Sequence, residues 1–187
     1  MRKIVWLLLL FTVTIVTESF GQEKKEMTRK ERREFEKQKQ AQLDSIYAIE
    51  IKKSIDEKKW VLEADRLANK QGQTVNVNST LNFVAIKGKE AYVQLGRDTG
   101  MGSNGVGGVT VRATVTKYDA DINKKGTYYI QIYLTSAVGS FDIRIDLNPT
   151  GQMATATISG NSSKKITYSG QVVPLSRSTV YKGTPLF

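Results

Sequence analysis

The stretch VTVRATVTKY at residues 109–118 alternates apolar and polar side chains along its length. Val109, Val111 and Val115 would lie on one face of an extended strand, because successive side chains of a strand point to opposite faces. The same alternation returns in FDIRIDL at residues 141–147. Both stretches therefore predict strands of a sheet with one buried face and one solvated face.

Short segments of the same kind surround these two stretches. We predict further strands at residues 74–77, 82–86, 91–95, 128–136, 154–159 and 166–173. The turns between them are short and carry Gly and Asn, which favours antiparallel pairing because a parallel crossover needs a dozen or more residues. The predicted fold is mainly β: an antiparallel meander that forms either a lipocalin-like barrel or a β-sandwich, preceded by a charged α-helix.

The segment before these strands is rich in charge. Residues 23–59 hold 12 basic and 9 acidic residues with no Gly and no Pro, a composition typical of a helix. In its second half, an apolar face recurs with helical period at Leu43, Ile46, Tyr47, Ile51 and Ile55. We therefore predict a solvated or frayed segment over 23–40 and a helix over 41–58 that docks on another surface.

The N-terminus has the three parts of a secretory signal peptide. Arg2 and Lys3 are followed by a short apolar stretch, and Ser19-Phe20-Gly21 places small residues at the positions that a signal peptidase requires. The alternative is a membrane anchor, which needs about 20 apolar residues. We predict cleavage after Gly21, no membrane span afterwards, and a mature protein that is periplasmic or secreted. The domains are then residues 1–21, 22–58 and 59–187.

Composition excludes several kinds of chemistry. The chain has 28 Lys and Arg against 18 Asp and Glu, a net charge of +10, and neither His nor Cys. Disulfides, thiolate nucleophiles, imidazole bases and zinc sites built from these ligands are therefore impossible. We expect no cofactor, no metal site and no enzymatic activity. Nucleic acid is not an expected partner, since the basic residues do not interleave with aromatic ones.

Residues 60–68 fit both a strand and a helix, and a family resemblance favours the strand. Six motifs recur in family order: WVLEAD from Trp60, LNFV from Leu81, AYVQL from Ala91, NGVGGVT from Asn104, ISG from Ile158 and VYKG from Val180. Together they resemble the domain of unknown function 4251 family, exported proteins common in Bacteroidetes. The resemblance spans Trp60 to Gly183 and implies a mainly β fold, but no activity and no site residues.

A glycine-rich loop is the first candidate site. Between residues 96 and 108 the chain carries six glycines, and long loops in compact domains often bind ligands. The GMGSNG run matches a dinucleotide fingerprint, but a strand follows it where that fingerprint requires a helix. The alternative is that the loop is long and mobile and has no binding role. The candidate ligand or partner residues are Gly100, Gly102, Asn104, Gly105, Gly107 and Gly108.

Aromatic residues on neighbouring strands form the second candidate. Tyr92, Tyr129 and Tyr133 could line the interior of a barrel and hold a small ligand, although cross-strand aromatic pairing is the plainer interpretation. A calcium loop starting at Asp119 is excluded because Lys124 stands where such a loop requires Gly.

Three functions follow from these observations. The first is an exported, non-enzymatic β domain that recognises a small ligand, a glycan or an envelope protein. The second is a scaffold that docks on a partner protein through the N-terminal helix. The third, which we favour least, is a hydrolase that uses carboxylates alone, with Glu63, Asp65, Asp119 and Asp121 as candidates. The oligomeric state and the choice between barrel and sandwich stay open.

Overall fold

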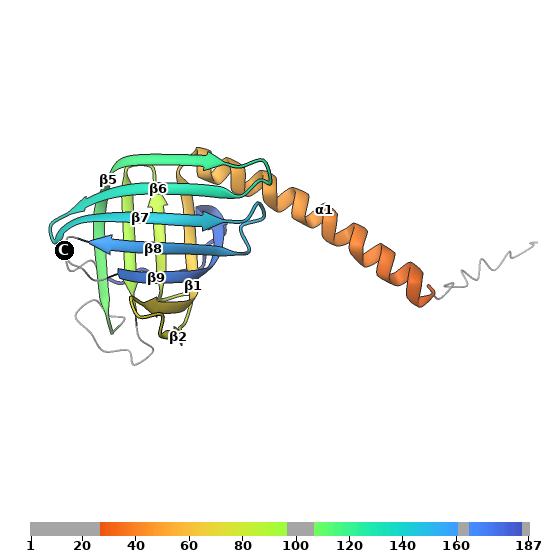
Figure 1. The fold of residues 1–187 in the computed structure, drawn as a ribbon, viewed down its shortest axis with the longest axis horizontal. Coiled ribbons are helices and arrows are strands. Elements are labelled where there is room, and N and C mark those ends of the chain that lie inside the picture. Colours follow the sequence, from red (N-terminus) through yellow and green to blue (C-terminus); the bar gives the residue numbers. More distant parts are fainter. Residues whose placement is uncertain (1–26, 97–106, 161–164, 185–187) are drawn as a thin grey trace, which may run out of the picture.

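A computed structural model describes residues 27–96, 107–160 and 165–184 of the chain. The predicted signal peptide and the loop residues Gly100, Gly102, Asn104 and Gly105 lie outside these ranges. Helix α1 comes first and nine strands follow (Figure 1): α1 Arg29–Asp56, β1 Lys59–Asn69, β2 Thr74–Asn76, β3 Phe83–Lys87, β4 Glu90–Leu95, β5 Val109–Ile122, β6 Tyr128–Ser136, β7 Gly139–Leu147, β8 Ala154–Gly160, β9 Lys165–Pro174 and a short 3-10 turn at Leu175–Arg177.

The sheet closes into a barrel, which decides between the two predicted architectures. From β3 to β9 each strand pairs antiparallel with the next, as the short turns predict. Strand β1 pairs with β3 on one side and with β9 on the other, so eight of the described strands form a closed barrel. The short β2 is an extra strand that pairs with the far half of β1.

The inner face of the barrel carries the core that the alternation predicts. Ile143, Ile145 and Leu147 of β7 are at most 2% exposed, whereas Arg144 and Asp146 between them are exposed on the outer face. A bulge in β5 between Val115 and Lys117 shifts the alternation by one position. The interior is filled by side chains, of which the largest are Trp60, Leu62, Ile86, Ile130, Ile132, Leu134 and Tyr168.

Helix α1 is longer than predicted and docks with only its last two turns. It begins with a capping box, in which Thr28 accepts a hydrogen bond from the Glu31 amide and Glu31 accepts one from the Thr28 amide. Its first half is helical and solvent-exposed, and the helix projects away from the barrel (Figure 1). Of the predicted apolar face, Ile51 and Ile55 are buried while Ile46 stays 53% exposed, because the helix runs past the edge of the barrel.

One tyrosine hydroxyl joins the docked end of α1 to the barrel. Tyr118 accepts a hydrogen bond from the Trp60 indole at 3.1 Å and donates one to the carbonyl oxygen of Ile55 at 3.1 Å. Burial raises the pKa of Tyr118 to about 12, because the phenolate would lose its hydration. Together with Ile51 and Ile55, these contacts cover the end of the barrel where β1 starts.

The C-terminal segment covers part of the outer face. Residues 175–184 lie over β1, β3 and β4, where Val180 and Leu175 pack on Val61 and Phe83. The segment is held by two buried polar side chains. Glu63 accepts hydrogen bonds from Ser178 and Thr179, and Gln94 donates to the carbonyl oxygen of Tyr181 and accepts from the Gly183 amide.

Candidate functional site

A hollow lies at the edge of the barrel where β1 ends. It measures about 820 Å³ and is mostly apolar. The helix reaches the barrel at the top of the view in Figure 1, whereas β2 lies at the bottom, so the hollow is at the end of β1 away from α1. We call it the distal hollow; the described residues that line it are Leu67, Ala68, Asn69, Lys70, Gln71, Gln73, Val75, Lys165 and Ile166.

Strand register explains why apolar side chains gather there. Leu67 is paired directly with Val75 on β2 and with Tyr168 on β9, and directly paired residues point to the same face of a sheet. Leu67 and Tyr168 belong to the core, so Val75 also faces the inside. Val75 is nevertheless 60% exposed, because β2 extends the sheet beyond the closed part of the barrel. The inner face of β2 is therefore an apolar wall open to solvent.

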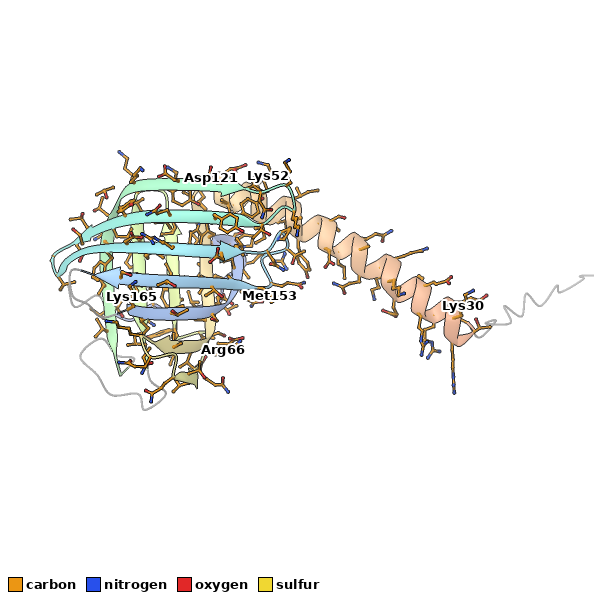
Figure 2. All side chains as sticks on the ribbon, in the orientation of Figure 1. Lys30, Lys52, Arg66, Asp121, Met153 and Lys165 are labelled. Atoms are coloured by element: carbon orange, nitrogen blue, oxygen red, sulfur yellow. The ribbon has the colours of Figure 1, made fainter. Side chains whose placement is uncertain are left out.

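Polar groups border this wall. The Asn69 side chain is already used, since it accepts hydrogen bonds from the amides of Gln71 and Gln73 and fixes the turn between β1 and β2. Lys70 and Lys165 are exposed, and Figure 2 labels Lys165 at the start of β9. The described lining contains two lysines and no acidic residue.

The three predicted tyrosines lie on the outside of the barrel rather than along its interior. Tyr129 and Tyr133 are 50% and 36% exposed. Tyr92 packs on the outer cluster under the C-terminal segment, with the Lys182 ammonium 4.2 Å from its ring centre. The described tyrosines that belong to the inner core or pack against it are Tyr118, Tyr128 and Tyr168. Tyr129 and Tyr133 point outward because the odd-numbered positions of β6 lie on the outer face of the barrel. The bulge in β5 does not change this alternation in β6.

Of the candidate residues in the glycine-rich loop, the structure describes Gly107 and Gly108, and both have a structural role. Gly107 has a φ of +66°, which favours glycine. A Cβ on Gly108 would stand 1.8 Å from the carbonyl oxygen of Leu95, so only glycine fits where the ends of β4 and β5 approach. Whether this loop binds a ligand stays a prediction.

The four candidate carboxylates are divided between two strands that do not pair. Glu63 and Asp65 lie on β1, and Asp119 and Asp121 lie on β5, whose partners are β4 and β6. Glu63 is buried under the C-terminal segment, and Asp119 forms an ion pair with Lys117 at 2.8 Å. Within the described ranges, no group of three His, Cys, Asp or Glu side chains is arranged to hold a metal ion.

A second, smaller hollow of about 350 Å³ lies between α1 and the end of β9. Glu50 of the helix and Arg177 form an ion pair across it, and the Arg177 guanidinium also lies 5.4 Å from the ring centre of Tyr47. Both interactions raise the pKa of Arg177, the hydrogen bond to Glu50 most. Because these charges are mutually paired and fasten the helix to the barrel, we assign this hollow a structural role.

Sequence reasoning missed the residues of the distal hollow. Val75 lies in a predicted strand, but its exposure depends on β2 extending past the barrel. Lys70 and Lys165 are 95 positions apart and are brought to the same hollow by the pairing of β1 with β9. No local motif marks such a site.

The fold and the hollow define the class of protein: a closed antiparallel β-barrel, covered by a helix at one end and with an apolar wall at the other that is exposed among the described residues. A family model described as "Domain of unknown function (DUF4251)" matches residues 42–172, and the chain belongs to this family. The resemblance carried by the six motifs is thereby confirmed. The match begins within α1, earlier than those motifs.

A solved structure agrees with this assignment. The chain is similar to a DUF4251 family protein from Bacteroides eggerthii DSM 20697, known from a crystal structure, with 30% sequence identity and a TM-score of 0.60. The similarity covers 71% of this chain and 91% of that one. No curated protein matches the chain. The family description names neither an activity nor a ligand.

Proposed function

We propose that the protein is an exported, non-enzymatic binding module that holds the apolar part of a small ligand in the distal hollow. The observation that carries this proposal is Val75, which faces the inside of the sheet beside the buried Leu67 and is still 60% exposed. An apolar, concave site with a few polar groups at its border is the common form of a small-molecule site.

The placement of the carboxylates supports a binding role over a hydrolase. Glycoside hydrolysis by carboxylates needs two of them, one on either side of the scissile bond. Glu63 is already engaged by three donors from Gln171, Ser178 and Thr179, and Asp119 and Asp121 are on a strand that does not pair with β1. None of these groups lines the distal hollow.

Binding in the hollow is tested with a neutral apolar fluorophore, N-phenyl-1-naphthylamine, whose emission rises when it leaves water. We expect saturable enhancement with the wild-type protein. Val75→Glu should abolish it, because a carboxylate on the wall disfavours apolar contact. Val138→Glu is the matched control, since Val138 is also exposed but lies in the turn between β6 and β7. No saturable enhancement, or equal binding by V75E, would refute the site.

Export is tested separately from binding. The proposal places the mature N-terminus at Gln22, so mass spectrometry of the protein recovered from the envelope or medium of an expressing bacterium should show a chain beginning there. In the part of the chain that the structure describes, no helix is long and apolar enough to cross a membrane. Recovery of the protein with residues 1–21 attached would contradict cleavage.

A second function, docking of a partner on α1, is favoured by the exposed apolar residues of the helix. Phe35, Ile46 and Ile49 are 51%, 53% and 70% exposed. Deletion of residues 23–49 removes all three of these exposed side chains and keeps Ile51 and Ile55, which belong to the core. If the helix mediates association, light scattering should show a lower mass after deletion. An unchanged monomer in both proteins would argue against this function.

A further inference from the structure

We propose, resting on the proposed function above, that the ligand of the distal hollow is an anionic amphiphile: a single apolar tail with a carboxylate or another singly charged acidic head group. The binding proposal concerns only the apolar wall. The inference adds the charge of the head group and the two residues that recognise it, Lys70 and Lys165.

The charge of the lining is the first argument. Two lysines and no acidic residue line the hollow. None of the ion pairs formed among the described residues involves either lysine, although seven such pairs occur elsewhere. The ammonium groups of Lys70 and Lys165 therefore have no described carboxylate partner, and a negative ligand group would supply one.

The position of the charges relative to the apolar wall is the second argument. Lys70 follows β1 directly and Lys165 begins β9, and the pairing of Asn69 with Ile166 brings these two chain positions to the same end of the sheet. Leu67 and Ile166 then continue the wall inward from this border toward Tyr168. The order along the hollow is charge first and apolar surface second, which matches a head group followed by a tail.

The closed floor is the third argument. Tyr168 is 1% exposed and donates a hydrogen bond from its hydroxyl to the carbonyl oxygen of Gln94 at 3.1 Å. Burial raises the pKa of this tyrosine, so the hydroxyl remains neutral. Beyond Tyr168 the described core is filled by side chains, so a tail that follows the apolar wall inward ends at this ring. The head group of such a ligand stays at the border.

Three amphiphiles with the same tail and different head groups test the inference: dodecanoate, dodecanol and dodecyltrimethylammonium, each below its micelle concentration. Each competes with N-phenyl-1-naphthylamine for the protein. We expect dodecanoate to bind most tightly and the cationic amphiphile least. An exposed ion pair contributes modestly, so removal of each lysine should weaken dodecanoate by about twofold to fivefold. Rising salt should reduce this preference, because the charges are exposed.

The variant K70Q/K165Q removes both charges, and K124Q/K125Q is the matched control. Lys124 and Lys125 are exposed in the turn between β5 and β6, outside the hollow, and their loss changes the net charge by the same amount. Only K70Q/K165Q should reduce the preference for dodecanoate over dodecanol.

The outcomes separate the two proposals. Equal binding of the three amphiphiles, or an equal effect of both lysine pairs, would overturn the inference about the head group while the apolar site stands. Failure of every amphiphile and of the fluorophore to bind would overturn both. Tighter binding of the cation would also refute the inference, because it would require a negative border.

Discussion

Replacement of Tyr118 by Phe removes the hydroxyl that joins helix α1 to the barrel. The Trp60 indole loses its acceptor, and Trp60 is 0% exposed, so its N–H becomes a buried donor without its partner. An orphaned buried donor costs about 1–3 kcal/mol. The Ile55 carbonyl oxygen keeps its hydrogen bond from the Lys58 amide at 3.1 Å, so its loss is smaller, about 1 kcal/mol. The expected destabilisation is about 2–4 kcal/mol.

Urea unfolding followed by Trp fluorescence measures this effect. With a denaturant slope of about 2 kcal/mol per M, the midpoint should fall by about 1–2 M. Tyr129→Phe is the matched control, because its ring is half exposed and its hydroxyl makes one long contact of 3.5 Å to Asn123. A midpoint in Y118F that equals that of Y129F would refute the view that this hydroxyl fastens the helix.

Alkaline pH provides a second measurement of the same group. The pKa of Tyr118 is raised to about 12 in the folded state, against about 10 when unfolded. The folded protein therefore holds this proton more tightly, and the resulting stability is complete below pH 10 and is lost as pH rises toward 12. The loss is at most about 3 kcal/mol. The stability difference between wild type and Y118F should shrink over this range, and a constant difference would contradict the assigned cause.

Three further changes have expected outcomes. Gly151→Ala should lower the urea midpoint, since its φ is +78° and a Cβ would lie 2.5 Å from a backbone oxygen of β9; Gly72→Ala, with φ +81° and open space, should cost less. Gln94→Met should speed amide exchange in residues 181–183, because this fully buried side chain holds the C-terminal segment; unchanged exchange there would refute that role. Deletion of residues 23–40 should change the free energy of unfolding by less than about 1 kcal/mol, whereas Ile55→Ala should lower it by about 2–5 kcal/mol. Equal losses in the two proteins would contradict the view that only the last two turns of α1 dock on the barrel.

The strands were predictable because one face of most of them is buried and the other is solvated. In β7 this gives the alternation of Ile143, Ile145 and Leu147 with charged residues, and the structure places the strand within two residues of its predicted start. Strand β1 was ambiguous for a physical reason. Residues 60–64 are all buried, since the core lies on one side and the C-terminal segment on the other, and a strand buried on both faces has no alternation to read.

Closure of the barrel was not predictable from local pattern. It depends on the pairing of β1 with β9, which joins Trp60 to Pro174 across most of the chain. The candidate tyrosines illustrate the same limit within one strand. The sequence correctly groups Tyr129 and Tyr133 on one face and Tyr128 with Ile130 and Ile132 on the other, but the apolar residues, not the aromatic ones, identify the inner face.

The two ends of the barrel show why a ligand is a reasonable complement to this fold. At one end Ile51 and Ile55 cover the core, and the helix residues themselves become buried. At the other end Val75 continues the inner face without a described cover and remains in water, which is unfavourable for an apolar side chain. A ligand tail on this wall would cover the apolar surface there, as the helix covers the core at the other end of the barrel. Binding would then stabilise the fold, by about 2.7 kcal/mol at a ligand concentration one hundred times its Kd, so a rise in unfolding temperature with dodecanoate should disappear in V75E.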